Sequence, residues 1–195
     1  MLTKSGVRAV YKTLRIRFKS LFVKKANIVL KYSNHGYFES PLLNGVVYRN
    51  YSIFSDISYQ TKKQIYDIVG KKKTDEMFLL FMQGANFWGI FMEDKIIGYW
   101  WTITAESLGN WYVPLEKDSV IFFAALIFPE WRGYSISPAV LHRIIEKEIS
   151  DEASIYLDVE TWNDSALRAW LKAGFIVIGT YPPLGKQELW SNGGI

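Results

Sequence analysis

The order of apolar and polar residues predicts strands and helices in alternation from about residue 46 onward. Short runs of β-branched and aromatic residues indicate strands, and apolar residues that recur every three or four positions indicate amphipathic helices. Glu93-Asp94-Lys95 separates two such runs and predicts a hairpin. The pattern predicts strands at 46–54, 87–92, 96–103, 119–128, 154–160, 176–180 and 187–190, and helices at 58–69, 138–149 and 164–173.

This order of elements favours an α/β fold. Several strands joined by short turns come first, and a strand–helix–strand–helix–strand series follows. We expect a mixed, mostly antiparallel central sheet with helices on both faces. At 195 residues the chain suits one domain with an appendage. We place the domain at 45–195, after a connector at 32–44 that contains the turn formers Gly36 and Pro41.

The segment 1–31 has a different character. Its apolar residues recur at three- and four-residue spacing, which predicts a basic amphipathic N-terminal helix. The segment contains nine basic side chains and no acidic one, whereas the whole chain has a net charge of +4, so the remainder carries −5. The residues that form the apolar stripe are Val7, Val10, Tyr11, Leu14, Phe18, Leu21 and Phe22.

The stripe and its flanking cations allow three kinds of partner. A helix of this kind can lie on an anionic membrane surface through residues 1–25. It can equally pack on its own domain or on a second copy of the chain, as in a homodimer. Contact with nucleic acid is the least favoured of the three. The pattern alone does not decide among them.

The composition narrows the function classes. An apolar fraction of 49% and an aromatic fraction of 16% are those of a folded protein. Because the chain contains no cysteine, disulfides, thiolate nucleophiles and cysteine metal sites are excluded. No run approaches the roughly 20 apolar residues that span a bilayer, and basic residues interrupt the N-terminal segment where a secretory signal would be apolar. We expect a cytoplasmic protein, at the inner face of the membrane if the helix docks there, without a metal site.

The most informative stretch begins at the apolar run Phe122 to Phe128. The run ends at Pro129, a turn carries Arg132-Gly133, and a helix is predicted from Pro138 with Ser137 as its N-cap. A strand that leads through a turn into a helix N-terminus presents backbone N–H groups and the positive end of the helix dipole. These groups favour a phosphate-bearing ligand.

A second motif follows at Asn163-Asp164-Ser165-Ala166-Leu167-Arg168-Ala169-Trp170-Leu171-Lys172-Ala173-Gly174-Phe175, a capped helix closed by glycine. Together the two motifs resemble the GNAT superfamily of N-acetyltransferases. The run from Ile136 to Leu141 and the basic N-terminal segment are similar to members linked to bacterial surface-polysaccharide synthesis. The phosphate loop of that family reads Arg/Gln-x-x-Gly-x-Gly/Ala. In this loop Ser135 and Ser137 occupy the positions where the family usually has a small residue. Trp170 occupies the position of the tyrosine that usually acts as the general acid in the family.

The resemblance implies that acetyl-CoA binds along the strand and the loop. Main-chain groups of Ala125, Leu126 and Ile127 would bond the pantetheine arm, and the amide near Ala125 would polarise the thioester carbonyl. The segment that begins at Asn163 would form the wall beside the arm. The pyrophosphate would bind the backbone of Arg132, Gly133, Tyr134, Ser135, Ile136 and Ser137.

The catalytic carboxylate is expected on the strand 154–160. Asp158 stands five residues before Asn163, at the place of a base in some members of the family. Strand alternation puts Asp158 and Glu160 on one face, where either could act as base, orient substrate or be solvated. Tyr181 or Tyr134 could replace the missing acid, or water could serve instead.

The acceptor site is expected among aromatic residues, and core packing is the competing interpretation for each of them. The candidates for substrate binding are Trp101, Trp111 and Tyr112, with Tyr99 and Trp100 beside them. Aromatic side chains can stack on sugar rings or on apolar chains. Alternatively, Tyr99 and Trp101 alternate into the core while Trp100 covers one sheet face.

These expectations favour an N-acyltransferase that moves an acetyl or short acyl group from coenzyme A to a primary amine. The resemblance suggests an amino sugar of surface-polysaccharide synthesis as the acceptor. One alternative is a macromolecular amine, on a charged tRNA or a protein N-terminus. Another is a domain that binds coenzyme A or a partner without turnover, since Trp170 and two loop serines depart from the family pattern.

Overall fold

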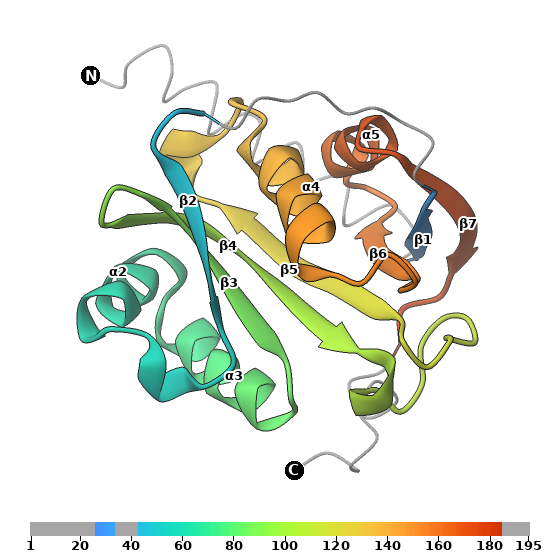
Figure 1. Cartoon of the computed structure of the whole chain (residues 1–195), viewed down its shortest axis with the longest axis horizontal. Helices are drawn as coiled ribbons and strands as arrows, with labels where there is room; N and C mark the ends of the chain where they lie inside the picture. Colours follow the sequence, from blue (N-terminus) through green and yellow to red (C-terminus); the bar gives the residue numbers. More distant parts are fainter. Residues whose placement is uncertain (1–25, 34–42, 185–195) are drawn as a thin grey trace.

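The computed structural model describes residues 26–33 and 43–184, which form a seven-stranded sheet with helices on both faces (Figure 1). The predicted fold class is therefore confirmed. The strands are β1 (Asn27–Tyr32), β2 (Val46–Tyr51), β3 (Asn86–Met92), β4 (Lys95–Thr104), β5 (Val120–Ile127), β6 (Ile155–Glu160) and β7 (Phe175–Tyr181). The helices are α2 (Tyr59–Val69), α3 (Lys71–Met82), α4 (Ile136–Glu148) and α5 (Asp164–Lys172).

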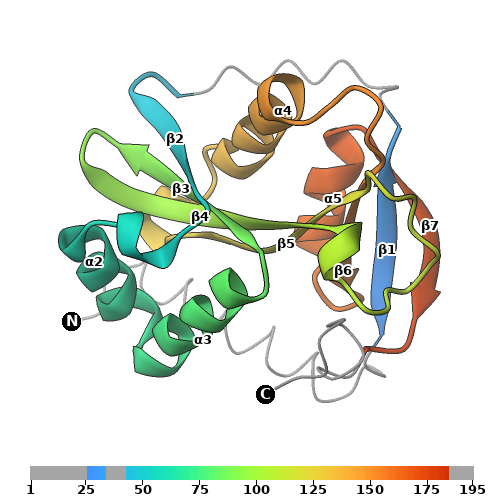
Figure 2. The ribbon, with the colours of Figure 1, turned by 60° about the horizontal axis from the view of Figure 1, so that its bottom comes forward.

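The strands lie in the order β2-β3-β4-β5-β6-β1-β7. All neighbouring strands are antiparallel except β5 and β6, which are parallel and are connected through α4. The β1 and β7 strands lie together at the end of the sheet opposite to β2 (Figure 2). The single parallel pair is therefore near the middle of the sheet.

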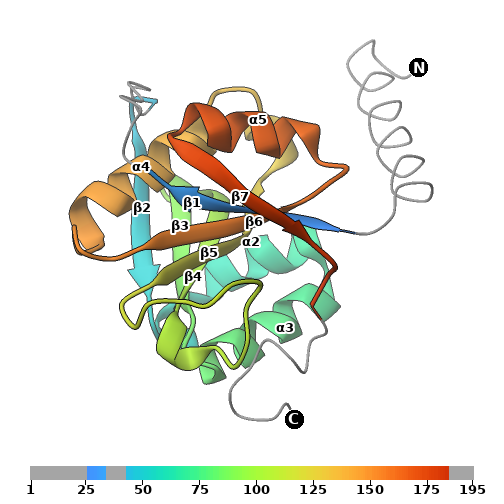
Figure 3. The same cartoon turned by 90° about the vertical axis from the view of Figure 1, so that its right-hand side faces the viewer.

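The two faces of the sheet pack against different helices. The α4 and α5 helices lie on one face, and α2 and α3 lie on the other (Figure 3). Residues of β4 alternate between the two cores, since Trp100 packs on the α4/α5 face while Tyr99 and Trp101 pack on the α2/α3 face. All three side chains are buried. For Tyr99, Trp100 and Trp101, the core-packing interpretation is the one that the structure supports.

Local sequence signals explain where α2 begins and how α3 follows it. The sequence pattern did not predict α3. The Ser58 hydroxyl accepts a hydrogen bond from the Thr61 backbone N–H, as an N-cap does. Gly70, at φ +81°, ends α2 and immediately precedes α3. The lysine run 71–73 is solvent-exposed, as expected, but it forms the first turn of α3. Only the later residues Met77 and Phe81 anchor this helix in the core.

The first strand corrects the predicted boundary of the N-terminal segment. Asn27–Tyr32 forms β1 between β6 and β7, so the helix prediction is wrong for 27–31 and the domain includes residues before 45. Val29 and Leu30 are fully buried. A short β-branched run packs better in a sheet than in a helix, and here tertiary pairing decides. The rest of the predicted helix, at 1–25, lies outside the described residues.

The remaining elements match the predicted ones within a few residues. One shift matters: α4 begins at Ile136 with Ser135 as its N-cap residue, so Ser137 and Pro138 lie inside the first turn. The predicted strand 187–190 lies outside the described residues. Within the described residues, no helix combines the length and the apolar character that crossing a membrane requires.

Candidate active site

The parallel strands β5 and β6 separate part-way along their length. They pair only from Val120–Ile155 to Phe122–Leu157. Beyond that point β5 continues beside β4, and β6 continues beside β1. Within the described residues, the edge of β5 that faces β6 therefore has no partner strand beyond Phe122. Such an edge offers backbone hydrogen-bonding groups to an extended ligand.

A bulge shapes β5 at this point. The register with β4 shifts between the pairs Trp101–Phe123 and Tyr99–Leu126, so β5 carries an extra residue. Ala124 adopts a positive φ of 47°, which residues other than glycine rarely do. Across the pair, a Cβ on Gly98 would lie 2.6 Å from the Leu126 carbonyl oxygen, so only glycine fits there. The bulge leaves Ala124 and Ala125 exposed at the strand separation.

A cleft of about 440 Å³ opens between the separated strands and the two helices on that face. We call it the α4/α5 cleft. Of the predicted cofactor-binding residues, Ala125, Ser137 and Asn163 line it, whereas Leu126 and Ile127 do not. Its lining residues are Asn27, Trp100, Phe122, Phe123, Ala124, Ala125, Ser137, Leu157, Asp158, Val159, Glu160, Asn163, Ala166 and Trp170.

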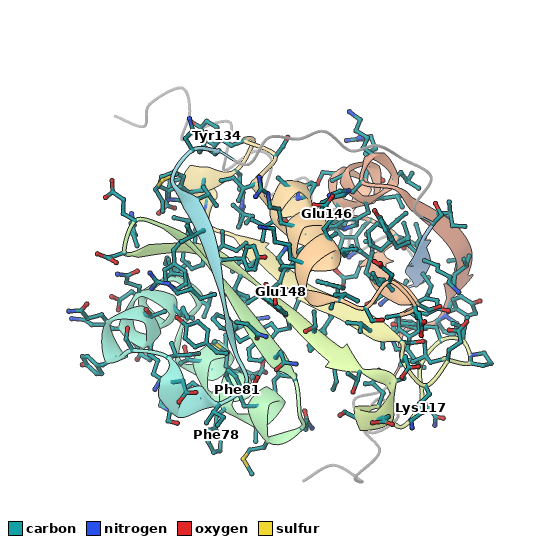
Figure 4. The ribbon with its side chains drawn as sticks, in the orientation of Figure 1. Phe78, Phe81, Lys117, Tyr134, Glu146 and Glu148 are labelled. Atoms are coloured by element: carbon teal, nitrogen blue, oxygen red, sulfur yellow. The ribbon has the colours of Figure 1, made fainter. Side chains whose placement is uncertain are left out.

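The loop before α4 has the form expected of an anion cradle. Gly133 has φ +94° and Ser135 has φ +55°, and the Ser135 side chain makes no capping hydrogen bond. The N–H groups of Ile136 and Ser137 therefore lack both an intrahelical acceptor and a side-chain cap. Figure 4 shows Tyr134 at the outer margin of the molecule beyond the start of α4, and its side chain is 60% exposed.

Arg132 stabilises this loop from within. Its Nε–H donates a hydrogen bond of 2.8 Å to the backbone carbonyl of Ile127, the last residue of β5. The guanidinium thus joins the end of the strand to the loop. The contact holds Arg132 close to the N-terminal end of α4, where its charge favours an anion.

Asn163 has a structural task as well as a place in the cleft wall. Its side-chain oxygen accepts hydrogen bonds from the Ala166 N–H at 3.3 Å and from the Ser165 hydroxyl at 3.1 Å. It is therefore the N-cap of α5. Further along α5, Trp170 is 6% exposed and packs its ring on Trp100, with 5.0 Å between the ring centroids. No tyrosine is among the described residues that line this cleft.

A second cavity, of about 350 Å³, lies on the opposite face of the sheet. We call it the aromatic pocket. The predicted substrate-binding residues Trp111 and Tyr112 line it, from the loop between β4 and β5. The two cavities share four lining residues, Asn27, Phe123, Asp158 and Glu160. The cavities therefore meet at the separation of β5 and β6.

The structure corrects the prediction that Trp101 binds substrate. This side chain is 1% exposed and packs on Phe81 and Phe87, with ring centroids 5.0 Å apart in both pairs. It does not line the aromatic pocket. Because the β4 alternation turns it into the core beneath α3, Trp101 stabilises the fold and does not contact a ligand in this pocket.

Asp158 lies at the meeting point of the two cavities within a small polar network. Asn27 Nδ2 donates hydrogen bonds to the Asp158 carboxylate and, at 2.7 Å, to the Tyr112 hydroxyl. The Tyr112 hydroxyl in turn donates to Asp158 at 3.4 Å. Both donors are neutral, so the carboxylate has no cationic partner in this network.

The environment of this network shifts two pKa values. Burial raises the pKa of the Asp158 carboxyl above its ordinary value, and the hydrogen bonds from Asn27 and Tyr112 oppose the rise. Burial, followed by the Asp158 charge, raises the pKa of Tyr112 to about 12. Tyr112 is therefore a hydrogen-bond donor at neutral pH, and Asp158 is better suited than a solvated carboxylate to accept a proton.

The other two predicted catalytic residues occupy different positions. Glu160 lines both cavities and shares the Asp158 face, as alternation predicted, but its side chain is exposed. Tyr181 lines neither cavity. Its ring packs near that of Tyr112, at 5.8 Å between centroids, and lies over Gly179. The structure therefore does not bring Tyr181 to the α4/α5 cleft, where an acid would be needed.

Asn27 is the site residue that the sequence pattern missed. It is 131 positions from Asp158 in the chain and comes from β1, which the pattern assigned to the N-terminal helix. The signal that could have found this strand is the short run Ile28-Val29-Leu30, since two of its three residues are β-branched. The pairing of Asn27 with Asp158 depends on where β1 enters the sheet, which no local pattern encodes.

Comparison with solved structures identifies the fold. An acetyltransferase from the GNAT family of Colwellia psychrerythraea superposes with a TM-score of 0.59 at 11% identity, over 81% of our chain and 54% of that chain. The chain has the GNAT fold. A tandem GNAT protein from the clavulanic acid biosynthesis pathway gives 0.56 at 13% identity, over 80% of our chain and 51% of its own.

A third structure is a GCN5-related glucosamine N-acetyltransferase region of a fungal multi-domain β-N-acetylglucosaminidase. It gives a TM-score of 0.52 at 10% identity, over 87% of our chain and 22% of that chain. Our chain thus spans about half the length of the first two structures. No protein-family model matches the sequence, and no curated protein sequence does.

Proposed function

We propose that this protein is an N-acyltransferase that moves an acetyl group from acetyl-CoA to a primary amine. One observation carries the proposal: cavities on opposite faces of the sheet meet at a partly buried carboxylate, Asp158. Two substrates that enter from opposite faces would meet at that carboxylate, which a transfer between them requires.

The α4/α5 cleft fits the shape and charge of coenzyme A. The unpaired edge of β5 beyond Phe122 would bond an extended pantetheine arm through main-chain groups, as an added strand does. The N–H groups at the start of α4, with Gly133 before them, would hold the pyrophosphate. Arg132 adds positive charge beside that site. Acetyl-CoA would supply an activated acetyl group at the strand separation.

Asp158 would accept the proton that the amine loses. The amine nitrogen bonds to the acetyl carbon, the carbon–sulfur bond breaks with its electron pair on sulfur, and free coenzyme A leaves as the thiol. Asn27 and Tyr112 orient the carboxylate through their hydrogen bonds. The backbone at Ala125 would polarise the acetyl carbonyl. Since no tyrosine lines the cleft within the described residues, the leaving sulfur would take its proton from water, and the proton held by Asp158 would pass back to the solvent.

Release of thiol from acetyl-CoA tests this function directly. We expect free thiol to appear only when a primary amine is present, together with an equal amount of the acetylated amine by mass spectrometry. Thiol without acetylated amine would indicate hydrolysis and would contradict the proposal. The family resemblance suggested an amino sugar as this amine. The lining of the aromatic pocket favours a different class of amine.

The second candidate function is binding of coenzyme A without turnover. The packing of Trp170 against Trp100 favours it, because a core tryptophan replaces the tyrosine that usually assists the leaving thiol in this family. This candidate predicts thermal stabilisation by acetyl-CoA with no thiol release for any amine. Thiol release at a rate that depends on Asp158 would exclude it.

A further inference from the structure

The residues of the aromatic pocket divide into two groups by position. Its polar side chains are Asn27, Tyr112, Asp158 and Glu160. Three of these four also line the α4/α5 cleft, and the fourth, Tyr112, is hydrogen-bonded to Asp158 and Asn27. The polar groups therefore gather at one end, where the two cavities meet, and the other walls are apolar.

The apolar walls come from several parts of the fold, including Ala26 before β1 and Pro183 and Leu184 after β7. Ile103 and Ile121 are buried residues of β4 and β5 that form part of one sheet face. Leu108 and Trp111 come from the loop between those strands, and Trp162 follows β6. Except for Tyr112 at the polar end, none of the side chains on these walls carries a hydroxyl, an amide or a charge. Among the side chains of these walls, the polar groups that a ligand can meet are therefore the indole N–H groups of Trp111 and Trp162.

The charge of the lining is one-sided. Two carboxylates lie at the polar end, and no lysine, arginine or histidine is among the described residues that line the pocket. A protonated amine is attracted to the polar end. An anionic group on the acceptor would have no cationic partner among the described lining residues, and a buried unpaired charge is strongly disfavoured.

We propose that the acceptor is a primary amine with an uncharged apolar body, such as an aromatic or branched aliphatic amine. This inference rests on the proposed function and specifies its substrate class. The apolar walls exclude water and bind the body of the acceptor, while the carboxylate end receives its amino group. Hydroxyl groups of an amino sugar, or the carboxylate of an amino acid, would be buried there without partners.

Two matched pairs of amines test the proposal with the full-length protein and saturating acetyl-CoA. Cyclohexylamine and glucosamine are ring amines that differ mainly in hydroxyl groups, and phenethylamine and phenylalanine differ in one carboxylate. We expect kcat/KM for thiol release to be at least about 100-fold higher for the apolar member of each pair, the order of magnitude by which such pockets discriminate. Equal or better turnover of glucosamine or phenylalanine would overturn the proposal.

A variant of Leu108, a residue of the apolar walls, tests whether those walls cause the preference for apolar amines. Leu108 is half-buried in the loop and takes no part in the polar network, so Leu108→Ser removes apolar contact without touching Asp158. We expect the ratio of kcat/KM for phenethylamine to kcat/KM for methylamine to fall about tenfold, because only the larger amine has an apolar body to contact this wall. The matched control is Leu79→Ser on α3, where the side chain is 47% exposed and lines neither cavity. Equal losses in both variants would overturn the assignment of this wall.

Calorimetric titration of phenethylamine and glucosamine separates failure of this inference from failure of the proposed function. If no amine releases thiol, yet phenethylamine binds and Leu108→Ser weakens that binding about tenfold, the substrate class stands and acyl transfer does not. If thiol release occurs with glucosamine but not with phenethylamine, acyl transfer stands and the substrate class is wrong. If phenethylamine neither binds nor reacts, the substrate class is also wrong.

Discussion

Asp158 is the residue on which the proposed chemistry depends. A carboxylate that is buried and bonded only to neutral donors is harder to ionise than a solvated one. In the folded protein its pKa is raised by burial in spite of the hydrogen bonds from Asn27 and Tyr112. Because its pKa is higher in the folded than in the unfolded state, ionisation of Asp158 lowers the stability of the fold as pH rises through the folded pKa. The proposed catalysis therefore requires Asp158 to be ionised, whereas the stability of the fold is higher when Asp158 is neutral.

The Asp158→Asn variant tests both effects of ionisation. Since an amide cannot accept the amine proton, we expect kcat for thiol release to fall about 10²–10⁴-fold. The melting temperature at pH 7 should not fall and is expected to rise, because the neutral side chain needs no ionisation in the buried site. This difference should vanish below about pH 4, where the wild-type carboxyl is also neutral. A variant with normal turnover, or one that melts lower at pH 7, would contradict this role of Asp158.

Glu116 shows the opposite titration behaviour. It accepts hydrogen bonds from the Tyr156 hydroxyl at 2.8 Å, from Ser119 at 3.1 Å and from Lys31 at 3.3 Å. Its own backbone N–H, followed by Tyr156, lowers its pKa to about 2. These contacts hold the end of the loop between β4 and β5 against β1 and β6.

A carboxyl whose pKa is lowered on folding stabilises the protein above the unfolded pKa and loses that contribution as pH falls through the folded one. We therefore expect Glu116→Gln to melt below wild type at pH 7, with the difference disappearing between about pH 4.3 and pH 2. Thermal melts of both proteins across that range measure it. A pH-independent difference would mean that the charge of Glu116 is not responsible. The side chain is 59% exposed, so a small effect is expected.

At the scale of elements, the local motifs could be predicted and the long-range pairing could not. The β5–loop–α4 unit and the cap of α5 follow from residues that are close in sequence, such as Gly133 and Asn163. The alternation that puts Asp158 and Glu160 on one face of β6 is also a local property. The entry of β1 beside β6, which brings Asn27 to the site, depends on pairing across the whole chain. The bulge at Ala124 is set by β4, because Gly98 allows the close approach.

Two variants of Asn163 distinguish a structural role, as the N-cap of α5, from a role in binding the cofactor. Asn163→Ala removes the acceptor for the Ala166 N–H, and we expect a loss of about 1 kcal/mol of stability. Asn163→Ser keeps a side-chain oxygen that can cap the helix, so its stability should stay close to wild type. Urea unfolding measures both values. If both variants bind acetyl-CoA normally, Asn163 acts as a cap; if both lose binding while Asn163→Ser stays stable, it contacts the cofactor.

At the scale of the whole molecule, the sheet separates the two proposed substrates. The α4 and α5 helices cover the face that would bind coenzyme A. The loop between β4 and β5 lies on the other face, which would bind the amine. The fold class could be predicted from the order of elements and from two motifs. The apolar nature of the aromatic pocket could not, because Ile103, Trp162 and Leu184 come from separate parts of the chain and meet only in the folded protein.

The measurement that tests this account most directly is the melting temperature with and without millimolar acetyl-CoA. At about 100 times its dissociation constant, a ligand adds roughly 2.7 kcal/mol, which corresponds to a rise of about 5–10 °C for a chain of this size. Ala125→Tyr should abolish the rise because it fills the α4/α5 cleft. Val47→Tyr, at a position that is 45% exposed on β2, should retain it. No rise in the wild type, or an equal rise in Ala125→Tyr, would contradict the proposed binding of coenzyme A in this cleft.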